Sequence, residues 1–248
     1  MSDCYTGAMA SDRTRAVPLW DDQPANVPGV AGVLGAPVVL VPGAVLLRDG
    51  LSPDEQRVLV AACREWAKPP AGMRATVMPN GSVMSAQTVC LGWHWYPYRY
   101  TRTVDDGDGG PVKPFPDQLT DLARGLLAAA DPTGTWWDAG AYVPDVALVN
   151  FYDRAAKMGL HQDKDERSLA PVVSISLGDD GVFRFGNTEN RNRPWQDVTL
   201  RSGDVVVFGG PARLAYHGVQ RIHPGTGPTD IGLDEGRLNI TIRESGLG

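Results

Sequence analysis

The sequence has 248 residues, of which 42% are hydrophobic and 21% charged, a composition typical of globular proteins. Lys and Arg number 23 against 29 Asp and Glu, and the formal net charge of −6 argues against an extended basic surface for gripping a duplex nucleic acid. The three cysteines show no C-x-x-C spacing, which argues against a disulfide framework or a cysteine-built zinc site and favours a reducing cytoplasm.

The first 35 residues are rich in Ala, Gly, Pro and Asp without periodicity, so we expect a flexible N-terminal arm over residues 1–35. No basic segment followed by an apolar run is present at the start, and no secretory signal is expected. The uncharged stretch 27–47 has the length of a membrane span, but its repeated Pro and Gly residues would break such a helix. Short buried extended segments at 37–41 and 44–47 are the favoured interpretation.

Two amphipathic helices are expected next. The first begins at Ser52-Pro53-Asp54-Glu55, where Ser52 can cap the helix and Glu55 can close a capping box. The second runs from about Asp117 to Ala130. Both apolar stripes are interpreted as core packing, and neither carries a candidate site.

After Tyr142 the sequence consists of short β-branched segments separated by Gly, Asp and Pro. They are DVALVNFYD, PVVSISLG, GVFRFG, DVTL, DVVVFGG and RLNITIRES. This pattern indicates a sandwich or jelly roll, so the fold class is α+β and mainly β. We expect one domain over residues 36–248, with its β core at about 142–245.

Two of the four histidines stand in a pattern that suits a metal. His161 and Asp163 are separated by one residue, so an extended backbone can point both side chains to the same side. His217 follows on another predicted β segment. Two imidazoles and one carboxylate form the facial triad of non-haem Fe(II) oxygenases, which leaves positions open for a co-substrate and O₂. From these residues alone, a polar turn at 161–163 and a core histidine at 217 is the alternative.

The C-terminal segment 237–243, RLNITIR, alternates strictly between polar and apolar residues. Its two arginines, with an amide between them, would suit a dicarboxylate, because each guanidinium can bind a carboxylate through two N–H groups. Asn150 and Tyr152, two residues apart on the strand that leads to His161, could add neutral hydrogen bonds. A strand with a solvated polar face is the alternative.

These segments together resemble a known family. The run LVNFYDRAAKMGLHQDKDE, followed by PVVSISLG, FRFG, RSGDVVVFGGPARLAYHG and RLNITIRES, is similar to the AlkB family of Fe(II)/2-oxoglutarate-dependent nucleic-acid dioxygenases. The resemblance covers about residues 72–245 and is densest from 147 onward. It implies a double-stranded β-helix, or jelly roll, preceded by helices and by a substrate-recognition lid at about 72–115.

The resemblance also implies a set of ligands. The catalytic Fe(II) would be bound by His161, Asp163 and His217. The co-substrate 2-oxoglutarate would be held by Asn150, Tyr152, Arg237, Asn239 and Arg243, with Arg237 and Tyr152 at its distal carboxylate. With O₂, the family hydroxylates an N-alkyl carbon and releases an aldehyde, succinate and CO₂.

Substrate recognition is assigned to the aromatic lid, because a flipped base needs stacking partners and hydrogen bonds to its edge. By the resemblance, Trp93 stacks on the base opposite His161, and Tyr98 and Tyr100 contact the nucleic-acid backbone. Asp165 would meet an exocyclic amino group, and Arg191 would lie at the pocket. From the residues alone, a core cluster under a loop is the alternative for these aromatic side chains.

The lid departs from the family pattern at Trp95, Tyr96 and Pro97, which leaves its register open, and Phe208 stands where a tryptophan is frequent. The acidic total charge favours a short single strand over a duplex. It would be gripped locally by Arg99, Arg102, Lys113, Lys157 and Arg191. His94 and His223 are expected to be structural or at the surface.

The leading functional hypothesis is oxidative demethylation of 1-methyladenine and 3-methylcytosine in single-stranded DNA or RNA. One alternative keeps the chemistry but moves it to modified tRNA or to a target other than nucleic acid. A second alternative is a β-sandwich binding protein whose polar cluster is structural, but such a module has no reason to keep both a ligand triad and a co-substrate strand. We expect a cytoplasmic monomer without membrane association.

Overall fold

The structure is a computed structural model that describes residues 35–248, so the expectation for the arm at 1–34 lies outside the described residues. The helices are α1 (Pro53–Ala67), α2 (Asp117–Ala130) and the short 3-10 helix η1 (Gly210–Ala212). The strands are β1 (Val38–Val41), β2 (Ala44–Leu47), β3 (Arg74–Val77), β4 (Val83–Leu91), β5 (His94–Tyr96), β6 (Arg99–Thr101), β7 (Val146–Tyr152), β8 (Met158–His161), β9 (Val172–Gly178), β10 (Asp180–Phe185), β11 (Gln196–Leu200), β12 (Val205–Phe208), β13 (His217–His223) and β14 (Arg237–Arg243). Within the described part of the chain, no helix is long and apolar enough to cross a membrane.

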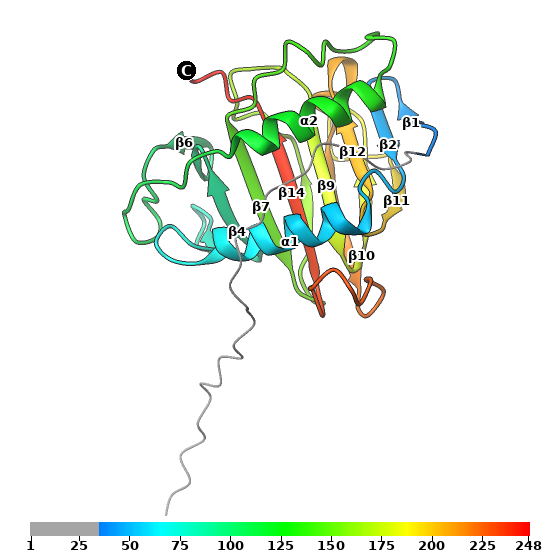
Figure 1. The fold of residues 1–248 in the computed structure, drawn as a ribbon. Coiled ribbons are helices and arrows are strands. Elements are labelled where there is room, and N and C mark those ends of the chain that lie inside the picture. Colours follow the sequence, from blue (N-terminus) through cyan, green and yellow to red (C-terminus); the bar gives the residue numbers. More distant parts are fainter. Residues whose placement is uncertain (1–34) are drawn as a thin grey trace, which may run out of the picture.

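Both predicted helices form where the sequence places them. The capping box of α1 is present, because Ser52 Oγ accepts from the Glu55 N–H at 3.3 Å and Glu55 Oε2 accepts from the Ser52 N–H at 2.7 Å. The buried stripe of α2 is the predicted one and includes Leu119, Leu122 and Leu126. The two helices cover the same face of the large sheet (Figure 1).

The strands form two antiparallel sheets that pack face to face. The large sheet has eight strands in the order β1-β2-β12-β9-β14-β7-β4-β3, and the small sheet has four in the order β11-β10-β13-β8. Phe183 and Phe185 of the small sheet share an apolar cluster with Val206 and Phe208 of the large sheet. The expected mainly β, jelly-roll fold is therefore confirmed.

Strand β14 separates the two layers by its alternation. Leu238, Ile240 and Ile242 belong to the core between the large sheet and the helices. The polar residues of β14 point to the other side, toward the small sheet, and all are buried; Arg237 is 1% exposed and Arg243 is 6% exposed. The alternative of a solvated polar face is wrong, because the small sheet covers this face.

The region predicted to be a lid is built from strands. The β3–β4 hairpin extends the large sheet beyond β7, and β5 and β6 pair as a separate two-stranded sheet. His94 on β5 is structural: it is fully buried and lies 2.7 Å from Asp106 and 2.8 Å from Arg74. These contacts attach the loop after β6 to β3.

Candidate active site

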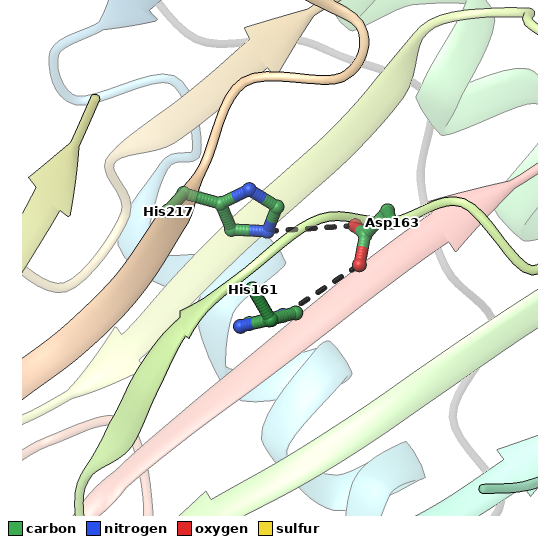
Figure 2. Close-up of side chains that lie close together, drawn as sticks. All are labelled: His161, Asp163 and His217. Carbon is green, nitrogen blue, oxygen red and sulfur yellow. Dashed lines mark ion pairs between the residues drawn. The ribbon is translucent and has the colours of Figure 1, made fainter. Parts of the chain in front are cut away.

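Three side chains that can bind a metal converge at one end of the small sheet (Figure 2). His161 ends β8 and His217 begins β13, and the two residues are cross-strand partners. Asp163 follows in the loop that leaves β8. One ligand atom from each residue lies within 4.8 Å of the other two. The structure thus brings the predicted ligand set together.

Each imidazole has one ring nitrogen held by the backbone, which leaves the other for a metal. His161 Nδ1 lies 2.9 Å from the carbonyl oxygen of Gly159, and His217 Nδ1 lies 2.9 Å from that of Ala215. An Nδ1–H that donates to a carbonyl leaves the lone pair on Nε2. Desolvation in the cavity and the neighbouring His217 lower the pKa of His161 to about 4, so its ring is neutral near pH 7.

Asp163 supplies the negative charge of this cluster. Burial opposes its ionisation, but the Arg243 guanidinium at 2.8 Å and the two imidazoles outweigh burial and hold its pKa well below the usual range. Asp163 Oδ1 pairs with Arg243, whereas Oδ2 is buried and has no hydrogen-bond partner. Each imidazole Nε2 lies 3.6 Å from one of the Asp163 oxygens (Figure 2). A buried carboxylate oxygen without a hydrogen bond, facing two imidazole nitrogens, fits a divalent cation such as Fe(II).

Arg237 is a buried cation without a carboxylate partner. Its Nη2 donates to Ser176 Oγ at 2.9 Å, while Nε and Nη1 have no partner, and the Tyr152 ring lies 5.4 Å from Cζ. Burial lowers the pKa of Arg237. Among residues 35–248, only Tyr152 acts in the opposite direction. A guanidinium with two unpartnered nitrogens, Nε and Nη1, fits the carboxylate of a bound ligand.

The other residues predicted to hold a dicarboxylate lie beside Arg237 in the register of β7 and β14. Tyr152 is the cross-strand partner of Arg237, and Asn150 is that of Asn239. Burial raises the pKa of Tyr152 to about 12, so its hydroxyl stays neutral. Asn239 donates to Ser174 Oγ at 2.8 Å and to the Ile175 carbonyl at 3.0 Å. The amide of Asn239 therefore fixes the cavity wall through bonds to β9.

All of these groups line one cavity of about 500 Å³ between the two sheets. The histidine–aspartate cluster and Arg237 belong to the same cavity, and the lid contributes Met78, Met84, Trp95 and Tyr98 to its wall. A space of this size takes a small dicarboxylate and a nucleobase-sized group together.

Comparisons with known proteins agree with this geometry. Residues 43–243 match the 2OG-Fe(II) oxygenase superfamily. The chain is 39% identical to the α-ketoglutarate-dependent dioxygenase AlkB of Escherichia coli K12, over 84% of this chain and 92% of that protein. The chain belongs to the AlkB family.

Other AlkB-family relatives are similar over much of this chain. The DNA N(6)-methyladenine demethylase ALKBH1D of Arabidopsis thaliana is 37% identical over 83% of this chain and 50% of its own length. The structure of OsALKBH1 superposes with a TM-score of 0.75 at 37% identity, covering 84% of this chain and 100% of that one. The chain spans about half the length of the first two Arabidopsis relatives that it matches.

The lid of this AlkB-family protein places Trp95, and not Trp93, at the cavity. The Trp93 indole N–H donates to Asp145 at 3.0 Å, and the Arg102 guanidinium covers its ring with Cζ 3.5 Å from the centroid. The physical reason is Gly92, whose φ of +78° turns the chain between β4 and β5. The expected position is therefore corrected, because Trp95 rather than Trp93 lies in the cavity wall, and stacking of Trp93 on a base stays a prediction.

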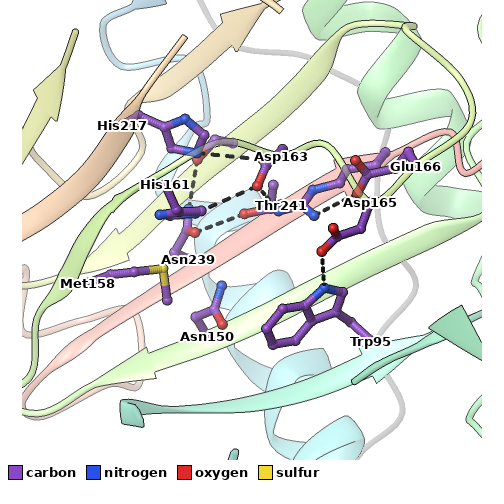
Figure 3. A network of polar contacts seen from close by, with 12 residues as sticks. Trp95, Asn150, Met158, His161, Asp163, Asp165, Glu166, His217, Asn239 and Thr241 are labelled. Atoms are coloured by element: carbon purple, nitrogen blue, oxygen red, sulfur yellow. Dashed lines mark hydrogen bonds and ion pairs between the residues drawn. The ribbon is translucent and has the colours of Figure 1, made fainter. Parts of the chain in front are cut away.

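The remaining predicted substrate residues divide into two groups. Tyr98, Asp165 and Arg191 line the cavity; Tyr98 is 67% exposed, and Asp165 accepts from the Trp95 indole N–H at 2.8 Å (Figure 3). Tyr100 is half-buried outside the cavity wall, and its hydroxyl donates to Glu166 at 2.5 Å. A contact of Tyr100 with a nucleic-acid backbone stays a prediction.

The predicted basic grip is also smaller than expected. Arg102 donates to the Gly92 carbonyl within the lid at 2.9 Å, and Lys113 donates to the Lys68 carbonyl at the end of α1 at 2.8 Å, so both are engaged within the protein. Arg191 is exposed at the cavity, and Lys157 is exposed next to β8. Lys164, which sequence reasoning left out, is exposed and lines the cavity.

Sequence reasoning also missed a buried pair behind the metal cluster. The Glu166 side chain is 0% exposed and lies between Arg243 at 2.8 Å and Arg213 at 3.2 Å. Burial opposes ionisation of Glu166, but Arg243 holds its pKa below the usual range. In the sequence, Glu166 stands three residues after Asp163, and this position was the one available indication that it belongs to the site.

Proposed function

We propose that this chain is an Fe(II)/2-oxoglutarate-dependent dioxygenase that removes methyl groups from ring or exocyclic nitrogens of bases in single-stranded DNA or RNA. The observation that carries the proposal is one cavity that holds both the His161–Asp163–His217 cluster and the unpartnered Arg237. A structural polar cluster gives no reason for two unpartnered nitrogens on a fully buried guanidinium.

Each end of the co-substrate has its own residues in this proposal. Arg237 and the Tyr152 hydroxyl would bind the distal carboxylate of 2-oxoglutarate, and Arg243 would stand beside the carboxylate at the metal. Fe(II), with 2-oxoglutarate and O₂, would supply the oxidation of the N-methyl carbon. The metal would be held by Nε2 of His161, Nε2 of His217 and Oδ2 of Asp163. The Nδ1 atom of each histidine is engaged by the backbone, and Oδ2 has no hydrogen-bond partner.

The base would lie between the lid and the metal cluster. Trp95, on strand β5 of the lid, forms an aromatic part of the cavity wall, and His161, on strand β8 of the small sheet, forms another part (Figure 3). Asp165 would accept a hydrogen bond from an exocyclic amino group, while its other oxygen accepts from the Trp95 indole. Adenine and cytosine present such a donor, whereas thymine presents a carbonyl oxygen.

Two kinds of methylated base fit this description. 1-Methyladenine and 3-methylcytosine keep an exocyclic amino group next to the methylated nitrogen. N6-methyladenine is a second candidate because the Arabidopsis relatives are named DNA N(6)-methyladenine demethylases. Modified tRNA is the alternative substrate class.

A panel of oligonucleotides tests the proposal. Single-stranded DNA and RNA of the same sequence, carrying each methylated base, are incubated with enzyme, Fe(II), 2-oxoglutarate and ascorbate and weighed by mass spectrometry. Loss of one methyl group from at least one oligonucleotide supports the proposal, and the comparison of DNA with RNA assigns the substrate class. No loss from any of them, with metal and 2-oxoglutarate shown to bind, would move the activity to a target other than nucleic acid.

We also propose that residues 36–248 act as one domain, with the lid at about 72–115 and the jelly-roll core at about 142–245, and that the protein is a cytoplasmic monomer. The buried contacts between helices, lid and both sheets support a single unit. Light scattering on the purified full chain tests the monomer, and fractionation of cells that express it tests the location.

A further inference from the structure

The polar cluster behind Asp163 joins four separate parts of the chain. Glu166 Oε1 accepts from the Tyr100 hydroxyl at 2.5 Å and from Arg243 Nη1 at 2.8 Å, and Arg213 lies 3.2 Å from Oε2. Tyr100 belongs to strand β6 of the lid, and Arg243 ends β14 in the large sheet. Glu166 is therefore the shared acceptor for the lid and the core.

Arg243 carries this contact to the metal cluster. While its Nη1 donates to Glu166, its Nη2 lies 2.8 Å from Asp163 Oδ1. With Oδ1 engaged, Oδ2 is the Asp163 oxygen without a hydrogen-bond partner. The orientation of the Asp163 carboxylate thus depends on the position of a guanidinium that Glu166 holds.

Burial makes this arrangement rigid and costly to break. The Glu166, Asp163 and Arg213 side chains are 0%, 3% and 3% exposed, and that of Arg243 is 8% exposed. Two carboxylates face two guanidiniums, so their charges balance. Loss of the Glu166 charge leaves the buried Arg213 without its carboxylate partner, and loss of the Asp163 charge leaves two buried guanidiniums on one carboxylate. Arg213 also donates through Nη1 to the Asp163 carbonyl at 2.5 Å, which fixes the backbone of the same residue.

We propose that Glu166 is a positioning residue that orients Asp163 through Arg243. The Tyr100 hydroxyl couples the lid to the metal cluster through Glu166 and through the hydrogen bond that it accepts from Arg243 Nη1 at 3.2 Å. This inference rests on the proposed Fe(II) site. The position of the lid that receives the substrate and the orientation of the carboxylate that binds the metal then depend on each other. Because coupling between two sites is reciprocal, metal binding steadies the lid as much as a seated lid strengthens metal binding.

The test measures metal binding without turnover, using Mn(II) as the probe and isothermal titration under anaerobic conditions. Glu166→Gln keeps the size of the side chain but removes its charge, and we expect it to weaken Mn(II) binding about 10- to 100-fold, as for other residues that orient a ligand. Tyr100→Phe keeps the ring and is expected to weaken binding by a smaller factor. Glu55→Gln is the matched control, because Glu55 is also buried but caps α1 on the helix side of the large sheet.

Hydrogen exchange over residues 93–101 separates coupling from a general loss of stability. In the wild type, Mn(II) should slow exchange in this segment, and Tyr100→Phe should remove most of that protection while the melting temperature of the variant shows that it is folded. Equal Mn(II) affinity in wild type, folded Glu166→Gln and Tyr100→Phe would overturn the inference, as would unchanged protection in Tyr100→Phe. Absence of Mn(II) binding in the wild type would instead reject the metal site and with it the proposed function.

Discussion

Arg237 and Arg243 stand at opposite ends of β14, and their surroundings differ in charge. Arg243 lies between two carboxylates, Asp163 and Glu166. Burial lowers the pKa of Arg237, and among the described residues only Tyr152 acts against that decrease. The alternation of RLNITIR predicted that both arginines share one face. The sequence could not predict which arginine is already paired, because the acidic partners of Arg243 come from a loop some 80 residues earlier in the chain, at 163 and 166.

Replacing Arg237 by Met separates ligand binding from folding. Because Arg237 is a buried cation with two unpartnered nitrogens, Arg237→Met should raise the free energy of unfolding of the ligand-free protein, by about 1 kcal/mol or more. The same variant should lose the increase in melting temperature that 2-oxoglutarate gives to the wild type with Mn(II). A ligand-induced increase that survives in Arg237→Met would show that the distal carboxylate binds elsewhere.

The two lid tryptophans provide a matched pair of substitutions. Trp95→Ala should lower kcat/KM for a methylated oligonucleotide about tenfold or more, because a stacked base contributes about 1–3 kcal/mol. Trp93→Ala should lower the melting temperature, since it removes the contacts to Asp145 and Arg102, but change kcat/KM of the folded enzyme little. The reverse order of the two kcat/KM values would restore the assignment made from the sequence.

At the scale of elements, periodic segments were predicted well and the lid was not. The first helix begins at its predicted capping box and the second occupies 117–130 as predicted, because a capping box and an apolar stripe are local properties. Strands β3 to β6 were not predicted, because their pairing partners and the bend at Gly92 are tertiary features. A Cβ atom at position 92 would lie 1.9 Å from the carbonyl oxygen of Asp145, which is a steric clash. Only glycine therefore permits this bend.

The buried His94 makes the lid sensitive to acid. Desolvation by burial, followed by the nearby Arg74, lowers the pKa of His94 below its ordinary value of 6.5, although Asp105 and Asp106 act in the opposite direction. The unfolded chain then binds more protons than the folded protein just below that value, so stability is lost as pH falls through it. From about pH 7.5 to about pH 5.5, the melting temperature should fall more in the wild type than in His94→Gln. Parallel decreases would contradict this role.

At the scale of the whole molecule, the packing of the two sheets buries the polar face of β14. Helices α1 and α2 cover the apolar face (Figure 1), and the small sheet covers the polar face. A cavity lined by His161, His217 and the polar residues of β14 lies between the two sheets. The metal triad could be predicted because its H-x-D spacing and the C-terminal strand occur together. Glu166 and Arg213 could not, because their roles exist only after both sheets and the lid have closed around them.

The central claim is that this cavity couples consumption of 2-oxoglutarate to removal of a methyl group, and the ratio of the two products tests it most directly. Succinate and formaldehyde are quantified from the same reaction on a methylated single-stranded oligonucleotide, with wild type and Asp163→Ala compared at equal concentrations of folded protein. We predict formation of the two products in about equal amounts by the wild type, with neither formed above background by Asp163→Ala. Demethylation that proceeds without succinate, or that persists in Asp163→Ala, would contradict the account.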